Sequence, residues 1–193
     1  MADRVLSSRL PRSGNAALAS AAVIQAVLGA EFVLAGLNKT LDANYPTQFR
    51  GFVQGSPGAN SGPLSALIQT LVVPNLDLVA EMSKAVELVA GGILLITAIE
   101  VLRRRLSGGV GAQHGYEPLL ALVSALAAGA LAGISLTIYF LEGGRLPTIN
   151  PAYAFTSPIA VELLLVPLAL GIAWIELARF FALRDTPSGA TAS

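Results

Sequence analysis

The sequence contains no cysteine among its 193 residues, and its only histidine is His114. The lack of cysteine excludes disulfides, thiolate metal sites, iron–sulfur clusters, c-type haem and dithiol redox chemistry. A single histidine also excludes a haem held by two histidines of one chain. We therefore expect no haem, no iron–sulfur cluster and no other metal.

Charged residues are scarce as well, at 12% of the chain, whereas soluble domains carry about 25%. Hydrophobic residues make up 54%. This leaves too little charge for a water-facing surface, which excludes an ordinary soluble enzyme, and the chain is too apolar to be disordered. The 12 basic residues are balanced by 12 acidic ones and form no long tract, so nucleic acid is not an expected partner.

Long apolar segments dominate what remains. A helix that crosses a bilayer needs about 20 mostly apolar residues. Four segments qualify: residues 16–37, 76–101, 119–140 and 159–181. The first is longer than the apolar core of a signal peptide, about 7–15 residues, and lacks a cleavage site, so we interpret it as an uncleaved helix. The sequence thus predicts an all-α membrane protein, a single membrane domain over residues 1–193.

The distribution of basic residues predicts the orientation of this domain, because they favour the cytoplasmic side of a membrane. One side holds eight: Arg4, Arg9, Arg12, Arg103, Arg104, Arg105, Arg179 and Arg184. The other side holds Lys39, Arg50 and Arg145. We expect an integral protein of a bacterial-type inner membrane, with both termini cytoplasmic and with outer loops at residues 38–75 and 141–158.

The outer loops carry their own signals. Residues 55–63 are rich in glycine, proline and serine, which predicts flexible turns. Residues 64–73, followed by Pro74, predict a short helix that lies on the membrane surface or caps the bundle. Tyr153 and Phe155 in the other loop are expected at the outer interface, with a lid over a site as the alternative.

Small residues predict where the helices touch. Gly29 and Gly36 share one face of the first span, Gly91 lies in the second, and Gly129 and Gly133 form a GxxxG motif in the third. Such residues allow helix backbones to approach closely in lipid. We expect a compact antiparallel four-helix bundle.

Ionisable residues inside the predicted spans cost at least about 2.5–3.5 kcal/mol each near the helix centre. Five lie in the outer half: Glu31, Glu81, Lys84, Glu87 and Glu162. The spacing of three places Lys84 between Glu81 and Glu87 on one side of its helix. We predict a buried cluster of Glu31, Glu81, Lys84 and Glu87 with Lys84 at its centre, and we expect Lys39 to reach only the outermost acid.

Two main interpretations of this cluster stay open. It is an ion-pair lattice that holds helices in register, or its members act as catalytic residues in proton-coupled chemistry on a ligand such as a quinone headgroup. The second interpretation rests on charge counting. Lys84 can pair with only some of the four acids, and a buried carboxylate without a partner takes up a proton, which it can then exchange with a ligand. A path for an ion or a substrate is a third interpretation.

Two short segments resemble a known family. Residues 32–39, Phe-Val-Leu-Ala-Gly-Leu-Asn-Lys, resemble the F-x-x-x-G-x-x-K end of the first helix in DoxX-like membrane proteins, and residues 87–91 resemble the E-x-x-x-G stretch of their second helix. The resemblance covers residues 29–100. It implies a four-helix bundle and, as in some members, a part in a thiosulfate:quinone oxidoreductase. It points to Gly36, Lys39, Glu87 and Gly91 as cofactor-binding residues.

We therefore predict a DoxX-like membrane subunit of a respiratory or redox complex that interacts with quinone. If its substrate is a sulfur oxyanion such as thiosulfate, basic residues of the outer side must meet it. The alternative is a purely structural subunit that docks onto a larger membrane assembly or onto copies of itself. Whether the chain is itself an enzyme stays open.

Overall fold

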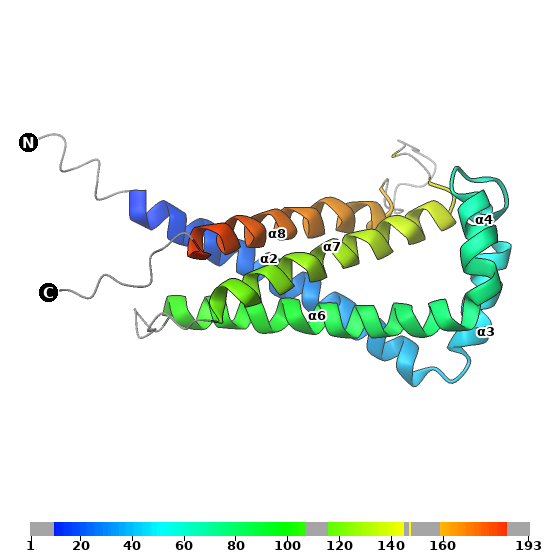
Figure 1. Cartoon of the computed structure of the whole chain (residues 1–193), viewed down its shortest axis with the longest axis horizontal. Coiled ribbons are helices and arrows are strands. Elements are labelled where there is room, and N and C mark those ends of the chain that lie inside the picture. The colour runs from blue at the N-terminus through cyan, green and yellow to red at the C-terminus, as the bar shows by residue number, and fades with distance from the viewer. Residues whose placement is uncertain (1–9, 107–115, 145–146, 148–158, 185–193) are drawn as a thin grey trace, which may run out of the picture.

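The computed structural model describes residues 10–106, 116–144, 147 and 159–184. Four long helices run antiparallel through it: α2 (Leu10–Leu41), α6 (Leu76–Leu106), α7 (Glu117–Leu141) and α8 (Val161–Arg184) (Figure 1). Each is long and apolar enough to cross a membrane. The predicted four-helix membrane bundle is confirmed, and the chain is an integral membrane protein whose helices face lipid.

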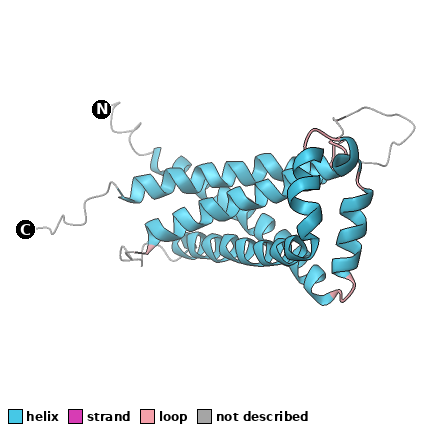
Figure 2. Cartoon of the chain, turned by 45° about the vertical axis from the view of Figure 1, so that its right-hand side comes forward, coloured by secondary structure: helices cyan, strands magenta, loops and turns pink. Residues whose placement is uncertain are grey.

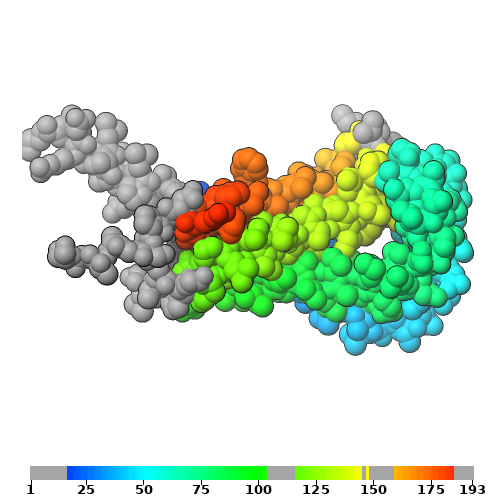
Figure 3. All heavy atoms as spheres, viewed as in Figure 1, coloured from blue at the N-terminus to red at the C-terminus, as the bar shows by residue number. Residues whose placement is uncertain are grey.

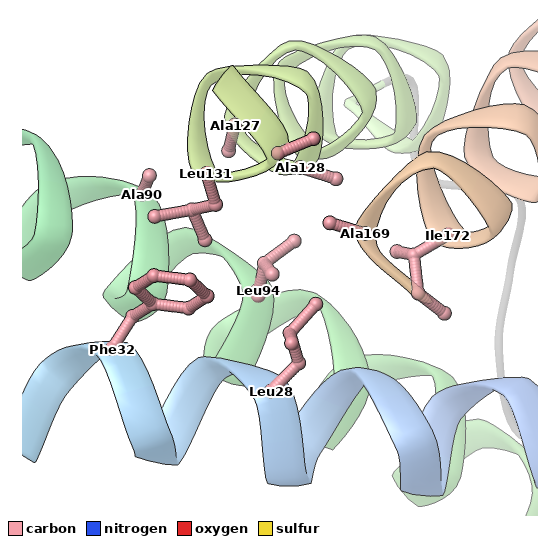
Figure 4. Close-up of a cluster of buried hydrophobic side chains, with 10 residues drawn as sticks. Leu28, Phe32, Ala90, Leu94, Ala127, Ala128, Leu131, Ala169 and Ile172 are labelled. Atoms are coloured by element: carbon pink, nitrogen blue, oxygen red, sulfur yellow. The ribbon is translucent and has the colours of Figure 1, made fainter. Parts of the chain in front are cut away.

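The centre of the bundle is a core of leucine, isoleucine and phenylalanine side chains filled in by alanine. Leu28 and Phe32 of α2 meet Leu94 of α6, Leu131 of α7 and Ile172 of α8 (Figure 4). Helix α2 packs most extensively on α6, and α7 on α8. The contact between α6 and α7 is smaller, which leaves room between these two helices.

The α2–α6 contact depends on glycine. A Cβ atom on Gly29 would lie 2.8 Å from the carbonyl oxygen of Gly91, and one on Gly91 would lie 2.9 Å from that of Gly29. A Cβ atom on Gly36 would lie 2.8 Å from the Leu88 side chain. In α7, by contrast, a Cβ atom on Gly129 or Gly133 would have no described atom within 4 Å. The GxxxG motif therefore does not mediate helix packing within the described part of the chain.

Helix α2 continues past its predicted end at residue 37 to Leu41, because polar residues extend the helix beyond its apolar stretch. Thr40 donates a hydrogen bond from its hydroxyl to the carbonyl of Gly36, 2.7 Å away, within this last turn. The extension places Lys39 on the helix, facing α6, instead of in a loop.

One end of the bundle is covered by residues 45–75, which we call the cap (Figure 2). It comprises α3 (Tyr45–Gly55), α4 (Pro57–Ser61), α5 (Ser65–Leu67), the π-helical η1 (Ile68–Val72) and the 3₁₀-helical η2 (Val73–Asn75). The cap has a core of its own, in which Val53, Ala59 and Ile68 pack with Leu76 and Leu141 of the bundle. It is therefore a folded element that closes the space between α6 and α7 at the end of the bundle where α6 begins and α7 ends.

Three details of this end differ from the prediction. Helix α3, the longest of the cap, was not predicted, because the prediction looked for long apolar runs. The apolar residues of α3 are instead spaced along one face of an amphipathic helix. Residues 57–61 form a short helix and not turns, since the Ser56 hydroxyl caps them by accepting from the amide of Ala59 at 3.1 Å. Pro74 does not end a helix, because it lies in the first turn of η2, where no amide donor is needed.

Gly58 of α4 gives the first test of this arrangement. A Cβ atom there would overlap the carbonyl oxygen of Phe140 near the end of α7. Gly58→Ala should therefore lower the free energy of unfolding by about 1–3 kcal/mol, measured by thermal unfolding in detergent. Gly51→Ala in α3, where a Cβ atom would meet nothing within 4 Å, is the control. Equal stability of the two variants would mean that α4 does not dock on α7.

Candidate functional site

A cavity of about 700 Å³ lies between α6, α7 and the cap. Figure 3 shows the surface hollowed between these two helices beside the cap. Most of its lining is apolar: Phe49, Phe52, Met82, Val86, Ile134 and Ile138. Its polar lining residues include Lys39, Tyr45, Ser83 and Glu87. The volume is within the range of small-molecule sites, which combine apolar walls with a few polar groups.

The central polar feature is an ion pair between Lys39 of α2 and Glu87 of α6. The Glu87 side chain is 2% exposed, and that of Lys39 is 24% exposed. The second carboxylate oxygen of Glu87, Oε2, is buried and has no hydrogen-bond partner among the residues that the structure describes. A buried charge is tolerated when it is paired, so Lys39 holds Glu87 at the cavity wall.

Tyr45, the first residue of α3, joins the cap to this pair. Its hydroxyl lies 2.9 Å from the Ser83 hydroxyl of α6. The Nζ atoms of Lys39 and Lys84 lie 5.8 and 5.7 Å from the centre of its ring, within the range of cation–π attraction. The tyrosine thus contacts both lysines and α6.

The charge state of Tyr45 follows from its surroundings. Burial raises the pKa of the phenol; the hydrogen bond with Ser83 lowers it, and the negative charges of Glu87 and Glu81 raise it. The net direction is upward from a value that is already far above neutrality. Tyr45 therefore keeps its proton at neutral pH. The Ser83 hydroxyl donates to the carbonyl of Ala80, 2.9 Å away, so Tyr45 donates to Ser83, and its oxygen can accept a hydrogen bond from a ligand in the cavity.

The predicted cluster of four ionisable residues is only partly assembled. Lys84 pairs with Glu81 of its own helix at 2.6 Å, and the Glu81 side chain is 61% exposed. Glu31 is exposed, and no ion pair links it to the others within the described ranges. The expectation that Lys84 is the central base was wrong, because an acid one turn away satisfies it and the extended α2 brings Lys39 to Glu87.

The residues implied by the family resemblance divide into two pairs. Lys39 and Glu87, which are 48 positions apart in the sequence, meet at the cavity. Gly36 and Gly91 are buried in the α2–α6 contact and do not line the cavity. Close packing of α2 on α6 therefore explains why both positions are glycine.

Two cavity residues, Tyr45 and Ser83, were missed at the level of the sequence. Finding Tyr45 required predicting α3, whose first turn places it over α6. Ser83 lies next to Lys84 and gives no signal of its own in the sequence.

Several other predicted features have simpler surroundings or are not described. Arg50 pairs with Asp77 at 2.8 Å, both being exposed, so Lys39 is the one that lines the cavity of the two predicted anion-binding residues that the structure describes. Arg145, Tyr153 and Phe155 lie outside the described residues. Within the described ranges, no group of three or more histidine and acidic side chains is arranged to hold a metal ion.

Removing the Tyr45 hydroxyl tests its hydrogen bond with Ser83 of α6. Tyr45→Phe should cost about 1 kcal/mol of stability, because it removes one partly buried hydrogen bond while keeping the ring beside both lysines. The control is Tyr116→Phe at the start of α7, which removes an exposed hydrogen bond to Glu100 and should cost less. Thermal unfolding in detergent measures both, and an unchanged midpoint for Tyr45→Phe would show that the Ser83 contact contributes nothing.

Comparison of the chain with protein-family models, with curated proteins and with solved structures finds no match. The fold and the cavity define the class: a four-helix membrane bundle with one capped end and an amphipathic cavity beneath the cap.

Proposed function

We propose that the protein binds the headgroup of a quinone in this cavity and acts as a DoxX-like membrane subunit of a respiratory or redox complex. The observation that carries the proposal is the Lys39–Glu87 pair at the wall of an otherwise apolar cavity. A quinone headgroup is apolar over most of its surface and polar at its two oxygens, which is the same combination.

The polar residues supply matching hydrogen-bond groups. Lys39 has three N–H donors and gives one to Glu87, so others are available for a quinone carbonyl. The Tyr45 hydroxyl donates to Ser83, and its oxygen can accept a hydrogen bond from a hydroquinone hydroxyl. The Glu87 carboxylate can accept a proton when a bound hydroquinone gives its electrons to an acceptor in the complex, and the protonated carboxyl can return that proton when an electron donor reduces a quinone. Proton-coupled chemistry at the pair is therefore part of the proposal, as is an electron donor such as thiosulfate.

The second candidate function is purely structural. It is favoured by the fact that the Lys39–Glu87 pair joins α2 to α6, as an ion pair that fixes helix register would. In that case the chain docks onto a larger membrane assembly, and the cavity has no redox ligand.

Quinone retention separates these two functions. The protein should be purified in mild detergent and its quinone extracted and quantified, together with two tryptophan variants of α7. Ile134→Trp fills the cavity, whereas Leu126→Trp changes a side chain that is 66% exposed and outside it. We expect wild type and Leu126→Trp to retain quinone and Ile134→Trp to lose at least about nine-tenths of it, a tenfold change in affinity. Wild-type protein that neither retains quinone nor binds added quinone would favour the structural subunit.

We further propose that the protein lies in a bacterial-type inner membrane with both termini in the cytoplasm and the cap outside. The absence of cysteine makes this easy to test with single introduced cysteines. A membrane-impermeant maleimide should label Ser61→Cys, which is exposed in the cap, in intact cells and should not label Ser188→Cys near the C-terminus. The opposite labelling would reverse the orientation.

A further inference from the structure

The cavity is closed at the end of the bundle that the cap covers. Phe49 of α3, Ile68 and Val72 of η1 line it there, and Ile68 is 2% exposed and part of the cap core. A ligand that came along the bundle axis from water would have to displace this core. The direct route to the cavity is therefore not through the cap.

The cavity is bordered on its other side by exposed residues at membrane depth. Met82 of α6, Gly133 and Thr137 of α7 line it and are exposed. Met82 is six residues from the start of α6, and Gly133 is eight residues from the end of α7. At 1.5 Å per residue these positions lie about 9 and 12 Å inside the helices, where lipid tails surround the bundle. The opening thus faces hydrocarbon.

Glycine at position 133 is not explained by contacts within the chain. A Cβ atom there would meet no described atom within 4 Å, although glycine costs about 1 kcal/mol relative to alanine inside a helix. Gly129, one turn away, has equally open space but does not line the cavity. The space beside Gly133 is therefore continuous with the cavity, whereas the space beside Gly129 is not.

We infer that the ligand enters from the lipid between α6 and α7, that its apolar tail leaves by the same opening across Gly133, and that this glycine sets the bulk that the opening admits. The inference rests on the proposed function and adds the route and the specificity-determining residue. It commits the site to ligands with a polar head and a long apolar tail, because a cavity of about 700 Å³ holds a head and the start of a tail while the remainder extends into lipid.

Two ligands and two variants test the route. The ligands are a benzoquinone without a tail and the same benzoquinone with a ten-carbon tail; the variants are Gly133→Leu and its matched control Gly129→Leu. Equilibrium dissociation constants are measured with the full-length protein in nanodiscs. Gly133→Leu should weaken binding of the tailed quinone by about tenfold or more and leave the tailless one within about threefold. Gly129→Leu should leave both within about threefold of wild type.

Each other result overturns a distinct part. The route is wrong if Gly133→Leu binds the tailed quinone with unchanged affinity, or if its affinity for both quinones falls equally. Either result leaves the proposed headgroup site standing. Failure of wild type to bind either quinone overturns the proposed function itself. If both leucine variants change the oligomeric state equally, this face of α7 docks another helix and the route is wrong. Met82→Trp narrows the same opening from α6 and repeats the test if Gly133→Leu does not fold.

Discussion

Replacing Lys39 with methionine should lower the free energy of unfolding by about 3–5 kcal/mol, because the change leaves a buried carboxylate without its partner. The Glu87 side chain is 2% exposed, and its second oxygen already has no hydrogen-bond partner among the described residues. The double variant Lys39→Met, Glu87→Gln removes both charges and should regain at least half of the loss. Denaturant unfolding in detergent micelles measures all of these variants.

Lys84→Met is the matched control for this experiment. It also removes a lysine ammonium group, here on α6, but the partner Glu81 is 61% exposed and can be hydrated when its lysine is lost. The expected cost is therefore below about 1 kcal/mol. If Lys84→Met destabilises the protein more than Lys39→Met, or if the effects of Lys39→Met and Glu87→Gln simply add, then Lys39 is not the residue that neutralises Glu87.

The spans could be predicted from the sequence because hydropathy directly reflects which segments can lie in lipid. Helix α6 begins at Leu76, as predicted from its apolar run. The angular argument about α6 was also sound, since Lys84 does pair with one of the two acids that flank it. It failed at Glu87 because helical spacing gives the direction of a side chain but not which neighbouring helix supplies the nearest opposite charge.

The cap could not be predicted to the same extent, because its helices are held by contacts distant in the sequence. Val53 of α3 is fully buried, and it packs in a core that also contains Leu141 at the end of α7. A contact between residues so far apart in the sequence cannot be predicted from a local run of apolar residues. Tyr45 depended on that missing helix, so the polar side of the cavity was recognised only through Lys39 and Glu87, to which the family resemblance had pointed without pairing them.

Adjacent glycines in α6 provide the second large effect, with opposite signs. Gly91→Ala should destabilise the protein by about 1–3 kcal/mol, because its Cβ atom would lie 2.9 Å from two backbone atoms of α2, the carbonyl oxygen of Gly29 and the amide nitrogen of Val33. Backbone cannot move aside as a flexible side chain can, so the two helices must separate. Gly92→Ala meets nothing within 4 Å and should stabilise the helix by up to about 1 kcal/mol.

The same pair of variants links helix packing to the cavity. Gly91 lies one helical turn after Glu87, so a shift of α6 away from α2 moves Glu87 away from Lys39 as well. Under the proposed function, Gly91→Ala should therefore weaken quinone binding as well as lower stability, whereas Gly92→Ala should preserve binding. Dissociation constants and unfolding curves recorded on the same preparations test both effects. Loss of stability in Gly91→Ala with unchanged quinone affinity would show that the headgroup does not depend on the Lys39–Glu87 geometry.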